Sequence, residues 1–437
     1  MKPTVEPAPR LVPLLSELAL AGCVVVSFVL AIVFFRDKGY LPQPFVFDTN
    51  DTFMDWFNTA YWANNPGAFD VWRTIYPPLS FVFLDTFSLP GCYLQSSFHA
   101  RDCDWLGRGT IYAFYLLNVV LAWLAFRKAD PRTAPMRTAA IALGMPLLFT
   151  LERGNLIIAA FAFFVIAHSE VTQSRRWRLF SAAVTINFKP YLVLPVLAHV
   201  VKRDWRTFEL AGIASVALYL VTLALVGSGT PGEIMSNTAN WVVFQSGQVW
   251  NEVNYSTSYA PLLRIRELQV PVLEFVPSKL MESIELWATL AIRLTQSVAL
   301  AALGAAWLQP RALPLYRISA ILFGAYLVTQ SPGGYTQVFL LFLVFLEPWR
   351  RPGPIVALVC AYLLSLLGDW TISTVMELSL KSWLSGRDVN PDFGLTVGHF
   401  LRPGLIAVIV WALALDAIAE VVRAHRRHRP SLGLAAA

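Results

Sequence analysis

Three short apolar hairpins with polar tips decide the fold of this chain. Their tips read LLFTLERGNL over residues 147–156, AVTINFKPYL over 183–192 and LVTQSPGGYTQV over 327–338. Each hairpin arm has about 10–16 apolar residues, fewer than the ~20 that a helix needs to cross a membrane. Arg and Lys flank both ends of every hairpin, and cytoplasmic loops are enriched in these residues. We therefore expect each hairpin to enter the membrane from the cytoplasm, stop before the far side and return.

The composition excludes a soluble globular protein. Apolar residues make up 56% of the 437 residues, charged residues 14%, and the mean hydropathy is +0.54. The apolar runs are continuous, whereas a β-barrel would show ~10-residue alternating segments. Because a backbone in lipid must satisfy its own hydrogen bonds, the sequence predicts an all-α polytopic membrane protein. The net charge of +6 follows from basic cytoplasmic loops and does not indicate a nucleic-acid partner.

We expect about twelve membrane segments in a single domain over residues 1–437, with both termini in the cytoplasm. The first segment, 11–35, is too long for a signal-peptide core and is expected to remain as a helix. Long outer loops at 36–108, 228–283 and 377–395 are expected to contribute to a site, the first two through interfacial helices. The other segments are expected at 109–126, 137–151, 155–168, 179–188, 190–201, 208–227, 284–308, 315–330, 334–346, 354–376 and 396–422.

The four cysteines show no zinc-binding spacing. Cys23 and Cys360 lie in apolar helices, where we expect them to be inert. Cys92 and Cys103 share the first outer loop, where an oxidising compartment would allow a disulfide. The sequence leaves this pairing open.

Three carboxylates follow the first helix: Asp48, Asp51 and Asp55. A carboxylate that faces a partly apolar crevice can have a raised pKa and act as a general base. The alternative is that Asp48 or Asp51 caps the helix that follows. Asp51 and Asp55 are four residues apart, so a helix would place them on one face.

The tips of the first two hairpins carry ionisable residues at a depth where charge is costly, which makes them functional candidates. Glu152, Arg153 and Asn155 lie at the first tip. Lys189 lies at the second, where Pro190 interrupts the helix. We expect Arg153 and Lys189 to approach the carboxylates from below. Alternatively, Lys189 snorkels to the interface, or Glu152 and Arg153 pair only with each other.

Further candidates for substrate contact lie on other elements. Arg73 and Tyr76 would approach the carboxylates from the side. Arg293 lies within a predicted helix, where we expect it to face away from lipid and bind phosphate or an acidic neighbour. His399 and Arg402 begin the last helix on its outer side.

A cationic pocket beside a carboxylate suits a substrate with a phosphate at the lipid boundary and a neutral polar head beyond it. Polyprenyl-phosphate sugars have this form. Inverting glycosyl transfer needs cations to stabilise the departing phosphate and a base for the acceptor hydroxyl. We expect no metal or other cofactor, because Lys or Arg can balance a monophosphate leaving group. Four outer tryptophans are candidates for stacking against the sugar: Trp56, Trp62, Trp72 and Trp241.

The motifs, taken in order, resemble glycosyltransferase family 87, the polyprenyl-phosphate-mannose-dependent mannosyltransferases and their bacterial relatives, which have the GT-C membrane fold. They comprise the acidic cluster, Tyr76-Pro77-Pro78-Leu79, Arg153-Gly154-Asn155, Lys189-Pro190 and Ser331-Pro332, over about residues 48–332. The resemblance implies an Asp base after the first helix, for which we favour Asp51 over Asp48 and then Asp55. Gly333-Gly334-Tyr335 departs from the bulkier or His-containing family sequence, so mannose does not follow.

The sequence therefore predicts a glycosyltransferase of the bacterial inner membrane that acts at the outer face. Its partners would be a polyprenyl-phosphate sugar donor, a glycan or glycolipid acceptor and membrane lipids. One alternative is an O-antigen or capsule polymerase, which would use arginines in a large outer loop such as Arg264 and Arg266. Another is a lipid-linked sugar flippase or transporter, which would need a polar path through the bundle. Charges gathered near one face disfavour that path.

Overall fold

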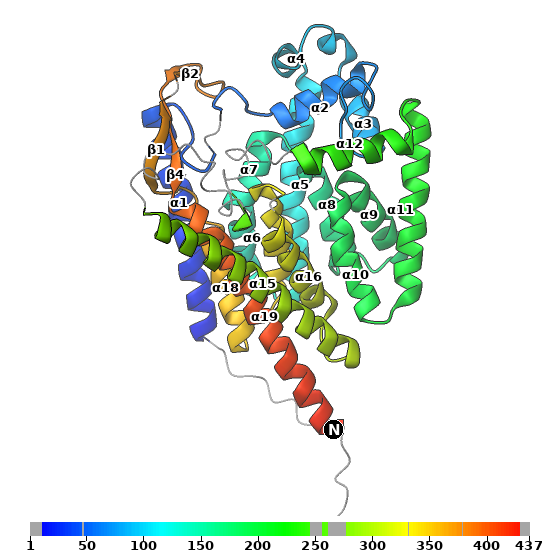
Figure 1. The fold of residues 1–437 in the computed structure, drawn as a ribbon, viewed down its shortest axis with the longest axis vertical. Coiled ribbons are helices and arrows are strands. Elements are labelled where there is room, and N and C mark those ends of the chain that lie inside the picture. Colours follow the sequence, from blue (N-terminus) through cyan, green and yellow to red (C-terminus); the bar gives the residue numbers. More distant parts are fainter. Residues whose placement is uncertain are drawn as a thin grey trace, which may run out of the picture.

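The computed structural model describes residues 11–45, 48–244, 256–260, 277–330, 332–377 and 379–428. These residues form a helical bundle, and several short helices gather at its upper end in Figure 1. Within the described ranges, six helical segments are long and apolar enough to cross a membrane. They are α1 (Leu11–Lys38), α5 (Trp105–Ala129), the α6–α7 pair (Ala134–Ala142 and Met145–Arg153), α11 (Trp205–Val226), α15 (Ser278–Leu308) and α19 (Gly398–His428). The fold is therefore that of a multi-pass membrane protein.

The three hairpins consist of short helices, as their apolar lengths predict. In the first hairpin, α6 and α7 lead to the tip and α8 (Ile157–His168) returns. The second hairpin contains α9 (Arg175–Phe188), the 3₁₀ turn η2 (Pro190–Val193) and α10 (Leu194–Val201). The third contains α16 (Leu315–Thr329), the 3₁₀ turn η5 (Gly334–Thr336) and α17 (Gln337–Val344). Helices α8 and α17 are almost entirely buried, so they form the centre of the bundle.

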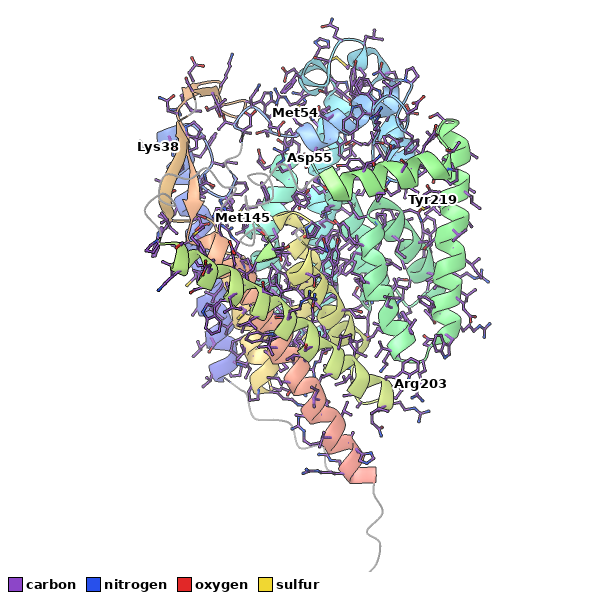
Figure 2. The ribbon with its side chains drawn as sticks, viewed as in Figure 1. Lys38, Met54, Asp55, Met145, Arg203 and Tyr219 are labelled. Atoms are coloured by element: carbon purple, nitrogen blue, oxygen red, sulfur yellow. A yellow bond between two sulfur atoms is a disulfide. The ribbon has the colours of Figure 1, made fainter. Side chains whose placement is uncertain are left out.

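The first long loop folds into short helices over one end of the bundle. These are α2 (Met54–Asn64), α3 (Pro78–Thr86), η1 (Pro90–Tyr93) and α4 (Ser97–Cys103). They lie at the upper end of Figure 1, together with α12 (Pro231–Phe244). Helix α1 begins and α19 ends towards the opposite, lower end, where Arg203 is labelled in Figure 2. The bundle therefore has a capped upper end and a basic lower end, where the turn between α10 and α11 contains Lys202 and Arg203.

The predicted helix over 354–376 is wrong in its second half. Helix α18 (Pro352–Leu364) ends early, and β1 (Thr371–Glu377) pairs antiparallel with β4 (Asp392–Thr396). Two shorter strands, β2 (Leu380–Lys381) and β3 (Asp388–Val389), form a second pair. Gly368 has a positive φ of 88°, and the β-branched run that follows favours a strand. The all-α fold class is confirmed, and two small two-stranded sheets replace the predicted end of this helix.

A buried ion pair joins α1 to α6. Arg137, which is 2% exposed, donates to both carboxylate oxygens of Glu17 at 2.9 and 2.6 Å. The Tyr362 hydroxyl donates to Glu17 at 2.9 Å, and Arg137 also donates to the Glu347 carbonyl at 3.0 Å. The guanidinium of Arg137 and the carboxylate of Glu17 are thus both hydrogen-bonded to groups from other parts of the bundle.

We predict that Arg137→Ala destabilises the bundle by about 3–5 kcal/mol, because it leaves the Glu17 carboxylate buried without its cation. Unfolding in detergent, followed by size-exclusion chromatography after heating, measures the loss. Arg132→Ala, at an exposed turn before α6, is the matched control. Equal melting of the two variants would contradict the prediction.

Candidate active site

Arg153, the last residue of α7, lies between two carboxylates from the first outer loop. Its Nη1 is 2.5 Å from Oδ2 of Asp51, and its Nη2 is 2.8 Å from Oδ1 of Asp55. The Asn155 amide donates to Oδ2 of Asp55 at 2.8 Å. We call these four residues the Arg153 cluster. The cluster joins the tip of the first hairpin to a segment about 100 residues earlier in the chain.

The backbone is shaped to bring these two segments together. Gly154 ends α7 in the left-handed conformation, with a φ of 61°, as helix C-termini often require. A Cβ on Gly154 would lie 3.1 Å from the Cα of Phe53, a tight contact, so glycine suits this close approach. Phe53 itself has a φ of 65°, and its N–H donates to the Glu152 carbonyl at 2.7 Å. Such strain costs on the order of 1–3 kcal/mol and tends to persist at functional sites.

Lys189 and Tyr76 lie close to Asp55. The Lys189 ammonium is 4.5 Å from the centroid of the Tyr76 ring, a cation–π contact. Both residues are close enough to Asp55 to interact with its charge. In the part of the chain that the structure describes, the ammonium has no hydrogen bond or ion pair. Lys189 therefore carries a partly buried positive charge that an anionic ligand could bind.

The pKa values of the two carboxylates of the cluster are shifted in opposite directions. Burial raises the pKa of Asp51 above its usual range, and Arg153 only partly offsets that effect. Burial also opposes the ionisation of Asp55, but Arg153, Asn155 and Lys189 together outweigh it and lower the pKa of Asp55. Burial and the charge of Asp55 raise the pKa of Tyr76 well above its usual range, so its phenol stays protonated. Asp51 is thus the carboxylate suited to accept a proton.

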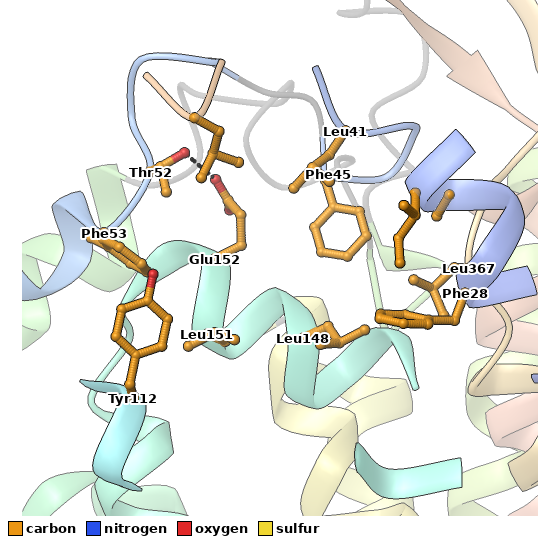
Figure 3. Close-up of a pocket in the computed structure, with 13 residues that line it drawn as sticks. Phe28, Leu41, Phe45, Thr52, Phe53, Tyr112, Leu148, Leu151, Glu152 and Leu367 are labelled. Atoms are coloured by element: carbon orange, nitrogen blue, oxygen red, sulfur yellow. Dashed lines mark hydrogen bonds between the residues drawn. The ribbon is translucent and has the colours of Figure 1, made fainter. Parts of the chain in front are cut away.

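A cavity of about 180 Å³ is lined in part by Thr52, Phe53 and Glu152, which are close in sequence to residues of the Arg153 cluster (Figure 3). Its walls are apolar side chains from α1, α5, α7 and the loops above them. The Thr52 hydroxyl donates to Oε1 of Glu152 at 3.0 Å. Oε2 of Glu152 is buried and has no hydrogen-bond partner among the described residues. The cavity therefore offers an apolar space with one carboxyl group near its polar end.

Three other predicted site residues lie outside the Arg153 cluster. Asp48 accepts a hydrogen bond from the Asn50 N–H at 2.8 Å, which stabilises the turn before Asp51. Arg73 is exposed in the loop before α3 and has a φ of 49°. Arg293 is exposed on α15 and donates to Gln296 at 3.3 Å. The structure therefore supports a positioning role for Asp48 and brings neither of these arginines into the cluster.

His399 and Arg402 belong to a separate network at the start of α19. The Thr396 N–H donates to Nδ1 of His399 at 2.8 Å, and Arg402 pairs with Asp369. Asp369 also accepts from the Gly398 N–H at 2.8 Å and from the Thr396 hydroxyl at 2.6 Å. Their described contacts thus order the entry into α19, and their contact with a substrate stays a prediction.

Sequence reasoning missed Tyr335, which lies beside Asn155 and Asp55. Its ring packs over Gly333, where a Cβ would lie 2.7 Å from the ring. The hairpin pattern located this tip but not the residue that reaches the cluster. Trp56, expected to stack on a sugar, is instead fully buried against Phe83. The predicted roles of four other residues fall on side chains outside the part of the chain that the structure describes. These residues are Trp241, Arg264, Arg266 and Ser331.

No protein-family model, curated protein or solved structure matches this chain. The fold therefore defines the class of protein by itself, and that class is a multi-pass membrane protein.

We predict that Asp55→Asn lowers the stability of the protein at pH 7 by about 1–3 kcal/mol, because it removes a paired carboxylate. The folded state lowers the pKa of Asp55. The stabilisation from Asp55 is therefore present above its unfolded pKa of ~4 and is lost as the pH falls through the folded pKa.

Melting temperatures at pH 7 and pH 3.5 measure this effect. Wild type should lose more stability on acidification than Asp55→Asn, whereas Asp85→Asn, at an exposed carboxylate, should behave as wild type. The same acid loss in wild type and Asp55→Asn would contradict the prediction.

Proposed function

We propose that the protein is an integral membrane glycosyltransferase that transfers a sugar from a polyprenyl-phosphate donor to a hydroxyl acceptor. One observation carries the proposal: Arg153 joins Asp51, whose pKa is raised, to Asp55, and Asp55 also interacts with the Lys189 ammonium, which has no hydrogen bond or ion pair among the described residues. Glycosyl transfer needs both a base and a cation. The resemblance of the ordered motifs to glycosyltransferase family 87 also supports it.

In the proposed reaction, the carboxylate of Asp51 takes the proton of the acceptor hydroxyl. The acceptor oxygen attacks the anomeric carbon of the donor from the side opposite the phosphate. The bond from that carbon to the phosphate oxygen breaks, and its electron pair leaves with polyprenyl phosphate. Lys189 stabilises the negative charge on the leaving phosphate, and the protonated Tyr76 would donate a hydrogen bond to it. The new glycosidic bond has the inverted configuration.

Arg153 has a different role in this proposal from the one that the sequence suggested. Both of its terminal nitrogens are engaged by Asp51 and Asp55. Arg153 therefore orients the base and balances its charge, while Lys189 binds the donor phosphate. Asn155 fixes Asp55 from the other side.

The cluster faces the non-cytoplasmic side in this proposal. Asp55 is labelled near the upper end of Figure 2, whereas Arg203, in a short basic loop, lies at the lower end. Short basic loops are typically cytoplasmic. A disulfide joins Cys92 to Cys103 at the capped end, and disulfides persist in oxidising compartments. The bacterial periplasm or cell exterior fits both observations.

The cavity beside Glu152 would bind an apolar part of a lipid-linked substrate. Its apolar walls favour a lipid chain, and Glu152, in its lining, directly precedes Arg153 in the chain. This arrangement would place the reacting hydroxyl beside Asp51.

We predict that Asp51→Asn lowers turnover by about 10²–10⁴-fold, because the amide cannot accept the acceptor proton. Lys189→Ala should lower it by about 10²–10³-fold through loss of phosphate stabilisation. Lys189→Arg should retain part of the activity, and Asp85→Asn should equal wild type. The assay incubates purified protein and membrane-lipid acceptors with a panel of polyprenyl-phosphate monosaccharides. Full turnover by both Asp51→Asn and Lys189→Ala would refute the assignment.

We also predict an acid limb in the pH profile of kcat/KM. The base must be ionised, and its pKa is raised. Activity should therefore fall as the pH decreases through a midpoint above ~4, the ordinary value for Asp. A midpoint at or below that value would exclude Asp51 as the base.

A further inference from the structure

Two residues from elsewhere in the fold, Arg101 through its side chain and Trp383 through its backbone, hold the segment that carries the proposed base. Arg101 of α4 donates from Nη1 to the carbonyl oxygens of Asn50 and Thr52, the latter at 3.3 Å. The backbone N–H of Trp383 donates to the carbonyl oxygen of Thr49 at 3.1 Å. Three of the four carbonyls over residues 49–52 are therefore fixed from outside the segment.

Arg101 is buried in a position that only an arginine suits. Its side chain is 3% exposed, and the guanidinium carbon lies 5.3 Å from the Phe98 ring and 4.8 Å from the Trp383 ring. The Trp383 indole donates to Asp102 at 2.8 Å, which fixes the second ring. A planar guanidinium can stack between rings while its fork of donors reaches two carbonyls, whereas a lysine ammonium cannot.

The helix that carries Arg101 depends on its attachments. Helix α4 has seven residues, fewer than an isolated helix needs for stability. Its last residue, Cys103, forms a disulfide with Cys92 in η1. The Tyr93 hydroxyl donates to Asp104 at 2.7 Å, just after α4. The disulfide thus attaches α4 two residues from the arginine that contacts the acidic segment.

We propose that Arg101 is a positioning residue for this site, and that the Cys92–Cys103 disulfide holds it against the segment that carries Asp51. The catalytic meaning of this role rests on the proposed function, because Arg101 acts through Asp51. A phosphine reductant and water convert the disulfide into two thiols and a phosphine oxide. Helix α4 is then free to separate, and the carbonyls of residues 50 and 52 lose their donors. The site is therefore assembled only in the oxidised protein.

Amide hydrogen exchange of the purified full-length protein, read by mass spectrometry, tests the positioning role without any substrate. The Asp51 N–H donates to the Asp48 carbonyl at 3.0 Å, and the Phe53 N–H is also bonded, so both amides report on the segment. We expect exchange over residues 49–53 to be at least about tenfold faster in R101A, R101K and C92S/C103S than in wild type. R108A, in α5, is the matched control and should leave exchange unchanged.

Phosphine treatment of wild type provides the same readout without a substitution. Cys23 and Cys360 are free thiols, so the Cys92–Cys103 disulfide is the bond that the treatment breaks. Reduction of the wild-type protein therefore tests the positioning role even if a variant fails to fold. Unchanged exchange over residues 49–53 after full reduction, or in folded R101K, would overturn the proposal. Absence of glycosyl transfer by wild type would instead contradict the proposed function and leave the exchange result standing.

The pH profile of transfer gives a second test, which a merely structural role would not change. In R101K, Asp51 is no longer held beside Arg153, and the Arg153 charge lowers the pKa of Asp51. The acid limb of kcat/KM should therefore move to higher pH. A lower kcat with an unmoved acid limb would count against positioning through Asp51.

Discussion

The bidentate contact of Arg153 with Asp51 and Asp55 is the interaction on which the site depends. Two carboxylates that are each only about one-fifth exposed would repel each other and resist ionisation without a cation between them. A guanidinium can bind both at once, because its donors are fixed in a fork. The contact also ties the first hairpin to the outer loop, so it organises the fold and the chemistry together.

Charge balance explains why a second cation accompanies this contact. Asp51 and Asp55 carry two negative charges, and Arg153 and Lys189 carry two positive ones. In the proposed reaction, Asp51 becomes neutral as it takes a proton while the leaving phosphate gains a negative charge. The net charge of the site therefore stays constant through the reaction. A buried site favours such a pathway, because uncompensated charge is costly in a low-dielectric environment.

The sequence predicted the helical segments better than it predicted the contacts between them. Hairpin arms follow from the lengths of apolar runs, and Lys189-Pro190 marks a tip because proline ends a helix. The partners of Arg153 could not be predicted in this way. Asp48, Asp51 and Asp55 are close together in sequence, and nothing in the local pattern distinguishes them. Tyr335 and Trp383 were missed because their positions depend on tertiary packing. Trp56 was misplaced because an interfacial tryptophan and a core tryptophan have the same local sequence pattern.

An experimental structure determined by electron cryomicroscopy with bound polyprenyl phosphate tests the central claim most directly. We predict that the phosphate lies within hydrogen-bonding distance of the Lys189 ammonium, on the side of Asp55. Arg153 should remain between the carboxylates of Asp51 and Asp55. A phosphate bound instead among the arginines at the basic lower end of the bundle would contradict it.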